Sequence, residues 1–335
     1  MNQPTSVSPG AEFKDRRGGL ICFGIIIIVI GCVCALFVPL MFLCQMMSVK
    51  ATGRAPNYSM MAPAALIYAL LAVAFVWLGI GSIMARRWAR ALLLILTWIW
   101  LVMGVFMIGF MAFFLPSVFA NQPPGGHQLP EAALVVTMIV TLGFMSVIFL
   151  VLPGMLVLFY RSPHVKATCE ARDPVVRWTD ACPLPVLALS LMLGFSAVSM
   201  LPMLVAYHSV MPFFGRLLTG APGTLLILVM IALWSYCAWA AYRLKPAGWW
   251  TILIGFGVMM ASTLITFARV DPIEMYRLMG YPEQQIAQIQ QYSFLKGSNF
   301  FLLMLICPLP LFGYLVWVKK YFCPPSTSSQ WSCRS

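Results

Sequence analysis

The chain has 335 residues, of which 61% are hydrophobic and only 9% are charged. Soluble domains carry about 25% charged residues, so this composition excludes a water-soluble protein with an ordinary surface. The net charge of +12 does not indicate nucleic-acid binding, because the basic residues do not form a basic domain. They lie beside long apolar runs, where anionic lipid headgroups are the expected neighbours. We therefore expect the lipid bilayer as a partner and no nucleic acid.

Eight apolar runs are long enough to cross a bilayer, which takes about 20 residues of helix. We place the spans at 20–47, 61–84, 91–115, 132–160, 184–208, 222–242, 247–268 and 298–318. All nine acidic and all 21 basic residues lie outside these runs, at the termini or in the connections. Charge at membrane depth usually marks a functional site, so its absence removes the usual route to a function. The predicted fold class is an all-α integral membrane protein with eight transmembrane helices.

The distribution of Lys and Arg predicts the orientation of the chain. Six of the 21 bases lie on one side of the predicted membrane: Lys50, Arg54, Arg216, Arg269, Arg277 and Lys296. The other 15 lie on the opposite side, which the positive-inside rule makes cytoplasmic. Both tails, 1–19 and 319–335, are therefore expected in the cytoplasm, beneath a bacterial-type plasma membrane. The stretch ending in Gly31-Cys32 also resembles a lipoprotein signal, but the apolar run continues past the cysteine and favours an uncleaved first span.

Weak internal similarity indicates two repeats. Four matches keep the same order along the chain, with offsets of 157 to 163: Gly31–Pro39 with Gly194–Pro202, Ala62-Pro63 with Ala221-Pro222, Arg86 with Arg243, and Leu152-Pro153 with Leu309-Pro310. The alternative is chance, because Gly and Pro are common in membrane helices. We interpret the chain as two parallel four-helix repeats, 20–160 and 184–318, joined by a charged cytoplasmic linker, 161–183.

Small residues and aromatic residues suggest how the helices pack. Ser190-x-x-x-Gly194 and Gly257-x-x-x-Ala261 each place small residues one turn apart, which lets helix backbones approach closely. Five aromatic side chains are expected at the cytoplasmic boundary as interfacial anchors: Trp88, Trp249, Trp250, Trp317 and Tyr160. Trp and Tyr at that depth are more typical of architecture than of a site.

Four cysteines on the predicted cytoplasmic side are the candidate metal ligands: Cys169, Cys182, Cys323 and Cys333. With His164 nearby they could hold zinc. Neither pair has the C-x-x-C spacing that lets one turn supply two ligands, so unpaired thiols are the simpler interpretation. A second group of sulfur side chains suits Cu(I) but is equally typical of core packing: Met41, Cys44, Met46, Met47, Met60 and Met61. No cofactor is expected.

The linker 161–183 is the most specific-looking stretch of the sequence. It carries charges of both signs and one tryptophan, and its candidate interface residues are Arg172, Asp173, Arg177, Trp178 and Asp180. These residues could form a docking surface for a protein or a clamp between the two halves. The alternative is a solvated connector whose bases lie against lipid headgroups.

The predicted outer segment, 270–297, contains two helix signals. Asp271-Pro272-x-Glu274 is typical of a helix start, and Gly280 of a helix end. A second helix over 283–292 places Ile286 and Ile289 on one face and glutamines elsewhere, which suits the outer bilayer surface. It could also cap a cavity.

The motif search leaves two main functions of different class, and as a third an enzyme that acts at the membrane surface with the cytoplasmic cysteines. The sequence has no H-E-x-x-H, no G-x-x-x-x-G-K-[ST] and no paired carboxylates at membrane depth, so it favours no enzyme mechanism. The preferred hypothesis is a non-catalytic accessory or scaffold component that engages a membrane or cytoplasmic protein partner. The alternative is an uncoupled transporter or permease for an apolar or weakly polar substrate, with a cavity between the two halves.

Overall fold

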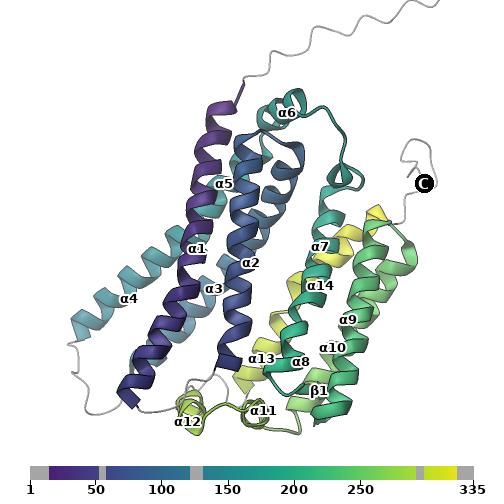
Figure 1. Cartoon of the computed structure of the whole chain (residues 1–335). Coiled ribbons are helices and arrows are strands. Elements are labelled where there is room, and N and C mark those ends of the chain that lie inside the picture. The colour runs from purple at the N-terminus through teal and green to yellow at the C-terminus, as the bar shows by residue number, and fades with distance from the viewer. Residues whose placement is uncertain (1–14, 53–57, 121–130, 292–297, 323–335) are drawn as a thin grey trace, which may run out of the picture. The chain divides into compact units, whose positions relative to one another are not determined.

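The computed structural model describes residues 15–52, 58–120, 131–291 and 298–322, and it is mostly helical (Figure 1). Within these residues, eight helical segments are long and apolar enough to cross a membrane. Each begins and ends within a few residues of a span read from the sequence. The prediction of eight apolar spanning helices is therefore confirmed by length and composition, and these fit a multi-pass membrane protein.

The chain divides into two compact units, each with its own packing. The first unit comprises residues 1–54, 65–108 and 143–180, and the second comprises residues 55–64, 109–142 and 181–335. Residues 109–142, which the sequence places in the first half, group with the second unit.

The helices of the N-terminal half of the chain belong to the first unit, except for residues 58–64, 109–120 and 131–142, which group with the second. Their bounds are α1 (Arg17–Thr52), α2 (Tyr58–Ile83), α3 (Arg87–Ala120), α4 (Glu131–Ser146), α5 (Leu152–Arg161) and α6 (Pro163–Arg172), with a π-helical turn at Val147–Val151. Helices α1 and α2 approach closely at two glycines. A Cβ on Gly24 would lie 3.0 Å from the carbonyl oxygen of Gly79, and a Cβ on Gly79 would lie 2.8 Å from that of Gly24. Backbone contact of this kind requires glycine on both helices.

The second unit is built mainly from the C-terminal half of the chain. Its helices are α7 (Leu184–Ser199), α8 (Leu201–Ala206), α9 (Gly220–Tyr242), α10 (Pro246–Phe267), α11 (Pro272–Leu278), α12 (Glu283–Gln291), α13 (Ser298–Ile306) and α14 (Leu309–Val318), followed by a 3-10 turn, Lys319–Tyr321. The Ser190 hydroxyl donates to the Ala238 carbonyl at 2.7 Å, so α7 and α9 meet where the small pair Ser190/Gly194 predicts. A Cβ added at Gly257 would meet no described atom within 4 Å, so the second small pair packs against nothing there.

One element departs from the all-helical expectation. Two short antiparallel strands, β1 (Met211–Phe213) and β2 (Arg216–Leu218), form a hairpin between α8 and α9. Its two-residue turn places Phe214 at φ 39° and Gly215 at φ 94°, the left-handed values typical of tight hairpins. Both turn N–H groups donate to α10 hydroxyls at 3.0 Å, Phe214 to Ser262 and Gly215 to Thr266.

The segment after α10 folds as the sequence predicts. The Asp271 carboxylate accepts a hydrogen bond from the Ile273 N–H at 2.9 Å and so caps α11. Gly280 has a φ of 82°, which ends that helix before α12 begins. On α12 the side chain of Ile286 is buried, so at least part of its apolar face packs against protein.

The turns before α3 and before α10 have the same backbone hydrogen bonds. Ala85 and Leu244 each adopt a left-handed conformation, with φ values of 52° and 55°. The corresponding bonds are Ala85 N–H to Ser82 O and Arg86 N–H to Gly81 O, and Leu244 N–H to Ala241 O and Lys245 N–H to Ala240 O, all at 2.9–3.0 Å. The two patterns are 159 residues apart.

Four of the five aromatic residues expected as interfacial anchors divide into two groups, and the fifth, Trp88, is half-buried. Trp249 and Tyr160 are buried, and each makes an internal hydrogen bond: the Trp249 indole donates to the Leu315 carbonyl at 2.9 Å, and the Tyr160 hydroxyl lies 2.7 Å from that of Ser82. Trp250 and Trp317 are about half exposed, as anchors would be. The anchor interpretation is therefore wrong for the two buried residues, because a polar ring atom that finds a partner inside the protein allows burial.

Candidate functional site

The linker forms α6 and a short 3-10 turn, Trp178–Asp180, at one end of the first unit. We call this the linker end, and it includes the turn between α2 and α3. The four acidic side chains that the structure describes there all form ion pairs: Asp15 with Arg172 (3.4 Å), Glu170 with Arg87 and Lys166 (both 3.8 Å), Asp173 with Arg86 and Arg177 (both 3.6 Å), and Asp180 with Arg87 (3.6 Å). The linker is thereby fixed to its own unit.

Asp173 is the centre of this arrangement. Its side chain is only 2% exposed and pairs with both Arg86 and Arg177. The carboxylate also accepts a hydrogen bond from the backbone N–H of Arg87 at 3.3 Å. Because Arg87 is the first residue of α3, Asp173 caps that helix and places a negative charge at its positive end.

The linker also caps α1. The Thr168 hydroxyl of α6 accepts a hydrogen bond from the backbone N–H of Arg16 at 3.2 Å. Asp15 accepts from the Arg17 N–H at 3.0 Å and pairs with Arg172. The beginnings of α1 and α3 therefore both depend on side chains from the linker or from Asp15, just before α1.

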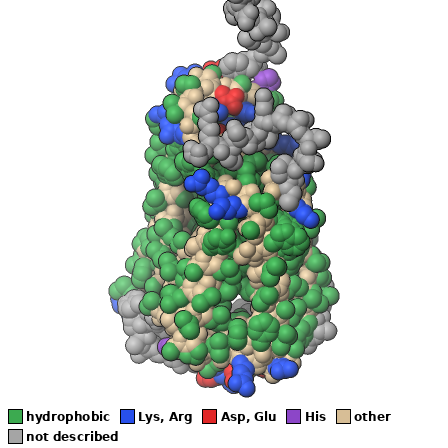
Figure 2. Space-filling model, turned by 90° about the vertical axis from the view of Figure 1, so that its right-hand side faces the viewer, with side chains coloured by type: hydrophobic (Ala, Val, Ile, Leu, Met, Phe, Trp, Pro, Cys, Tyr) green, Lys and Arg blue, Asp and Glu red, His purple; other side chains and the backbone are tan. Residues whose placement is uncertain are grey.

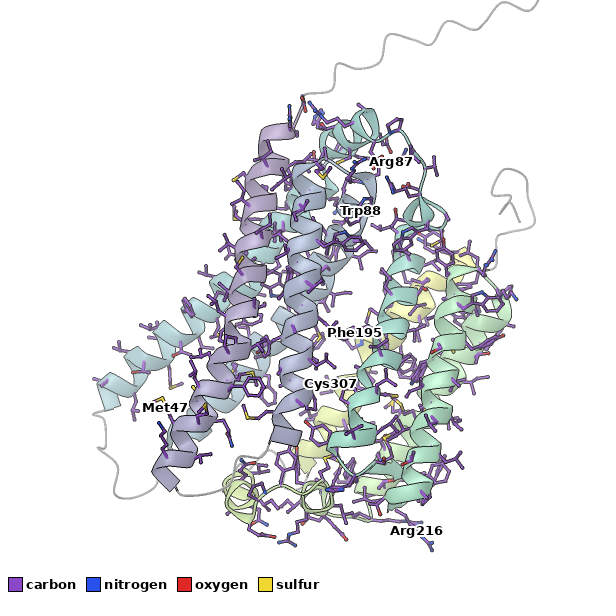
Figure 3. The ribbon with its side chains drawn as sticks, viewed as in Figure 1. Met47, Arg87, Trp88, Phe195, Arg216 and Cys307 are labelled. Atoms are coloured by element: carbon purple, nitrogen blue, oxygen red, sulfur yellow. The ribbon has the colours of Figure 1, made fainter. Side chains whose placement is uncertain are left out.

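The charged interface candidates are thus engaged within the first unit. Arg172 pairs with Asp15, and Arg177 pairs with Asp173 and donates its backbone N–H to Asp180 at 3.1 Å. Figure 3 labels Arg87, whose side chain contacts the linker acids at this end. These contacts hold the linker within one unit, which is neither the docking surface nor the clamp between the two halves that the sequence suggested.

The same loop presents apolar side chains outward: Trp178, which the sequence analysis named, and two valines that it overlooked. Val175, Val176 and Trp178 are 60%, 69% and 47% exposed, between the buried Asp173 and the ion-paired Asp180. The adjacent valines inside a charged stretch were the sequence feature that could have indicated this apolar surface. The loop holding them is fixed at both sides by ion pairs, so these side chains are displayed on an ordered surface.

The cysteines do not gather into a metal centre in the part of the chain that the structure describes. No group of three or more His, Cys, Asp or Glu residues suited to a metal occurs there. Cys169 and Cys182 are buried, and Cys323 and Cys333 lie outside the described residues. Burial raises the pKa of the Cys169 thiol to about 11, which the nearby Arg90 charge only partly offsets. The thiol is therefore protonated at neutral pH, unlike an activated nucleophile.

Four members of the sulfur group that suits Cu(I), Met41, Cys44, Met46 and Met47, lie on α1. Cys44, Met46 and Met47 are exposed on this helix, and Figure 3 shows Met47 at its far end from the linker. The side chain of Met60 lies outside the described residues. Exposed sulfur side chains on a spanning helix are ordinary lipid-facing groups.

One end of the second unit also carries basic residues, but its chemistry differs from that of the linker end. It comprises the turn between α9 and α10 and the 3-10 turn after α14. Three lysine ammonium groups lie over aromatic rings there: Lys245 over Trp239 (4.0 Å to the ring centroid), Lys319 over Trp249 and Trp250 (5.0 and 5.6 Å), and Lys320 over Trp317 and Tyr321 (4.6 and 5.1 Å). None of these lysines forms an ion pair with a described acidic residue.

Comparison of the chain with protein-family models, with curated proteins and with solved structures finds no match. The linker end of the first unit is therefore the candidate functional site on its own geometry.

Proposed function

We propose that this protein is a non-catalytic membrane component that binds a protein partner through the linker loop Val175–Trp178. One observation carries the proposal: three large apolar side chains are exposed on a loop that ion pairs hold in place. Apolar and tryptophan side chains presented on an ordered surface are typical of the central residues of protein interfaces.

The chemistry of the site supports binding rather than catalysis. Cys169 is protonated and buried, and His164 is exposed on the first turn of α6. The four acids are occupied in ion pairs, so no free carboxylate is available among the described residues there as a general base. The remaining prominent property of the loop is its apolar surface.

The orientation and the duplication belong to the same proposal. The linker end carries the larger share of the bases, so we assign it to the cytoplasmic side, where a cytoplasmic partner would meet it. The matching turns at Ala85 and Leu244 support a duplication with a local offset of 159. By this geometry Arg86 corresponds to Lys245, two residues beyond the match that the sequence suggested.

Site-specific photo-crosslinking in cells tests the proposal. A photoreactive residue at Val176 should give an adduct with one protein of defined mass. The matched control is Ala171, which is exposed on α6 only a few residues away. The adduct at Val176 should disappear when Val175→Ser and Trp178→Ala are introduced together. Equal adducts at both positions, or adducts with lipid alone, would contradict the proposal.

The transporter remains the alternative function. It predicts movement of an apolar solute across vesicles that contain the purified chain and no partner. A purified protein that is monomeric, binds no partner and transports would replace the scaffold proposal with this one.

A further inference from the structure

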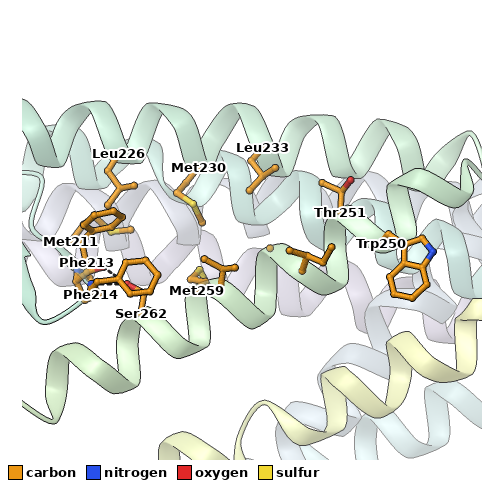
Figure 4. A pocket seen from close by; sticks show the side chains of 14 residues that line it. Met211, Phe213, Phe214, Leu226, Met230, Leu233, Trp250, Thr251, Met259 and Ser262 are labelled. Atoms are coloured by element: carbon orange, nitrogen blue, oxygen red, sulfur yellow. Dashed lines mark hydrogen bonds between the residues drawn. The ribbon is translucent and has the colours of Figure 1, made fainter.

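A groove of ligand size lies within the second unit, between α9 and α10 (Figure 4). Its volume is about 460 Å³, within the range of small-molecule sites. Its walls are apolar: Leu226, Met230 and Leu233 come from α9, and Ile254, Val258 and Met259 from α10. Figure 2 views the molecule from the side of these helices, where hydrophobic side chains cover the middle of the surface.

The length of the groove suits one lipid chain. Its lining on α10 runs from Trp250 to Ser262, which at 1.5 Å per residue is about 18 Å. One leaflet supplies roughly 15 Å of hydrocarbon, half of the bilayer core. The groove is therefore about as long as an acyl chain that enters from one leaflet.

The hairpin closes one end of the groove. Met211, Phe213 and Phe214 line that end, beside Ser262 (Figure 4). The hydrogen bonds from the hairpin turn to Ser262 and Thr266 hold the hairpin on α10. A chain lying in the groove would consequently end against these aromatic rings.

The opposite end of the groove is cationic. Trp250 lines it, and the Lys319 ammonium lies 5.6 Å from the centroid of that ring. Helix α10 also begins there, at Pro246, so the positive end of its dipole lies on the same side. Because no described acidic residue pairs with Lys319, its charge is available to an anion from outside the chain.

Glycine forms part of the groove floor. A Cβ added at Gly255 would lie 3.6 Å from the Trp234 ring and 3.7 Å from Leu233, which is ordinary contact. A larger side chain at this position would extend into the space between the two helices. Gly257, two residues further along α10, is outside the lining, and a Cβ there would have no described atom within 4 Å.

We propose that this groove binds one anionic phospholipid of the leaflet at the Lys319 end. One acyl chain lies between α9 and α10 and ends at the hairpin, and the phosphate lies beside Lys319. The site is independent of the linker loop, so it stands whether or not the proposed protein partner exists.

Native mass spectrometry of the full chain released from detergent tests this site. Phosphatidylglycerol and phosphatidylcholine with identical acyl chains are the two probes. Wild-type protein should retain phosphatidylglycerol more strongly. Lys319→Gln should lower retention of phosphatidylglycerol about fivefold, the effect of one base near a lipid surface, and lower that of zwitterionic phosphatidylcholine by less. The control is Lys166→Gln, an exposed lysine of the first unit, which should change neither.

The chain-binding part is tested with a second matched pair. Gly255→Leu should lower retention of both lipids at least about fivefold, the loss of roughly 1 kcal/mol of apolar contact, whereas Gly257→Leu should change neither. Val258→Trp fills the same groove from an exposed position and replaces Gly255→Leu if that variant fails to fold. Equal retention of the two lipids by wild-type protein, or equal loss with Lys166→Gln and Lys319→Gln, would overturn the headgroup assignment. Loss of a dimer with Gly255→Leu at unchanged lipid retention would assign the groove to a second copy.

Discussion

The two units differ in how their basic ends are neutralised. In the first unit, four acidic side chains pair with Arg and Lys, and the buried Asp173 also caps α3. In the second unit, Lys245, Lys319 and Lys320 lie over aromatic rings with no described acid beside them. Basic residues at a membrane boundary can therefore stabilise the fold or remain available to an outside anion. The presence of acids in the same connection decides which.

The largest expected effect concerns how tightly the linker end of the first unit is packed. A thiol with a pKa of about 11 has roughly one-hundredth of the thiolate at pH 8 that a pKa of 9 gives, so Cys169 in the folded protein should alkylate about a hundredfold more slowly than in the unfolded chain. The rate should rise as the pH approaches 11. Iodoacetamide labelling followed by mass spectrometry of the Cys169 peptide measures this. Equal rates in the folded and unfolded chains would show that this end is open.

The same pKa gives a stability prediction of known sign. The folded protein holds the Cys169 proton more tightly than the unfolded chain does. Protonation of Cys169 therefore contributes to the free energy of unfolding, and this contribution is fully present below about pH 9. It should be lost as the pH rises from about 9 to about 11. Unfolding measured across this range should show a decline that Cys169→Ala removes.

Removing the central acid should be the next largest effect. Asp173→Ala deletes the cap of α3 and leaves Arg86 and Arg177 without this partner, which should cost about 2 kcal/mol of unfolding free energy. The control is Asp15→Ala, whose exposed pair with Arg172 should contribute below about 1 kcal/mol. Unfolding in mild detergent compares the two. Equal losses would mean that burial of Asp173 does not matter.

Neutralising one base in each unit compares the two ends directly. Arg87→Gln leaves Glu170 and Asp180 without this partner and should cost about 1.5 kcal/mol. Lys319→Gln leaves no described acid behind and removes only ring contacts, so it should cost about 0.5 kcal/mol. A larger loss for Lys319→Gln in the same unfolding assay would reverse the comparison.

The smallest effect concerns the shared turn. Ala85→Gly relieves a left-handed backbone at the expense of one buried methyl group and should stabilise the first unit by about 0.5 kcal/mol. Leu244→Gly should instead destabilise the second, because Leu244 packs against its core. Thermal unfolding measures both changes in stability. Changes of opposite sign would support one turn geometry with different packing in the two units.

Much of the helical architecture could be predicted from the sequence, but the hairpin could not. Apolar runs mark helices because a bilayer requires their length and excludes charge, and the Asp271-Pro272 signal acts locally. The hairpin depends on Phe214 adopting a left-handed conformation, which a tight turn normally reserves for Asn, Asp or Gly. Ser262 and Thr266, which bind its turn, lie about 50 residues further along the chain.

The sequence singled out charged residues of the linker but not the contacts that they make. Arg172, Asp173, Arg177 and Asp180 stood out because charge was dense around them. Which of them is buried depends on the start of α3, 86 residues away in the chain. The exposed valines were overlooked because an apolar pair in a short connection carries no periodic signal. Burial of Trp249 likewise depends on a carbonyl of α14.

The sequence by itself determined the eight spans and the removal of charge from them, because an unpaired charge in hydrocarbon costs too much free energy to occur without a function. Only the tertiary structure decided which charges neutralise one another. It brought Asp173 to the start of α3, left Lys319 beside Trp250, and opened a groove between α9 and α10. The composition and length of the apolar runs restrict where a residue can lie in the membrane. Which charged side chains pair depends instead on distances between residues far apart in the chain.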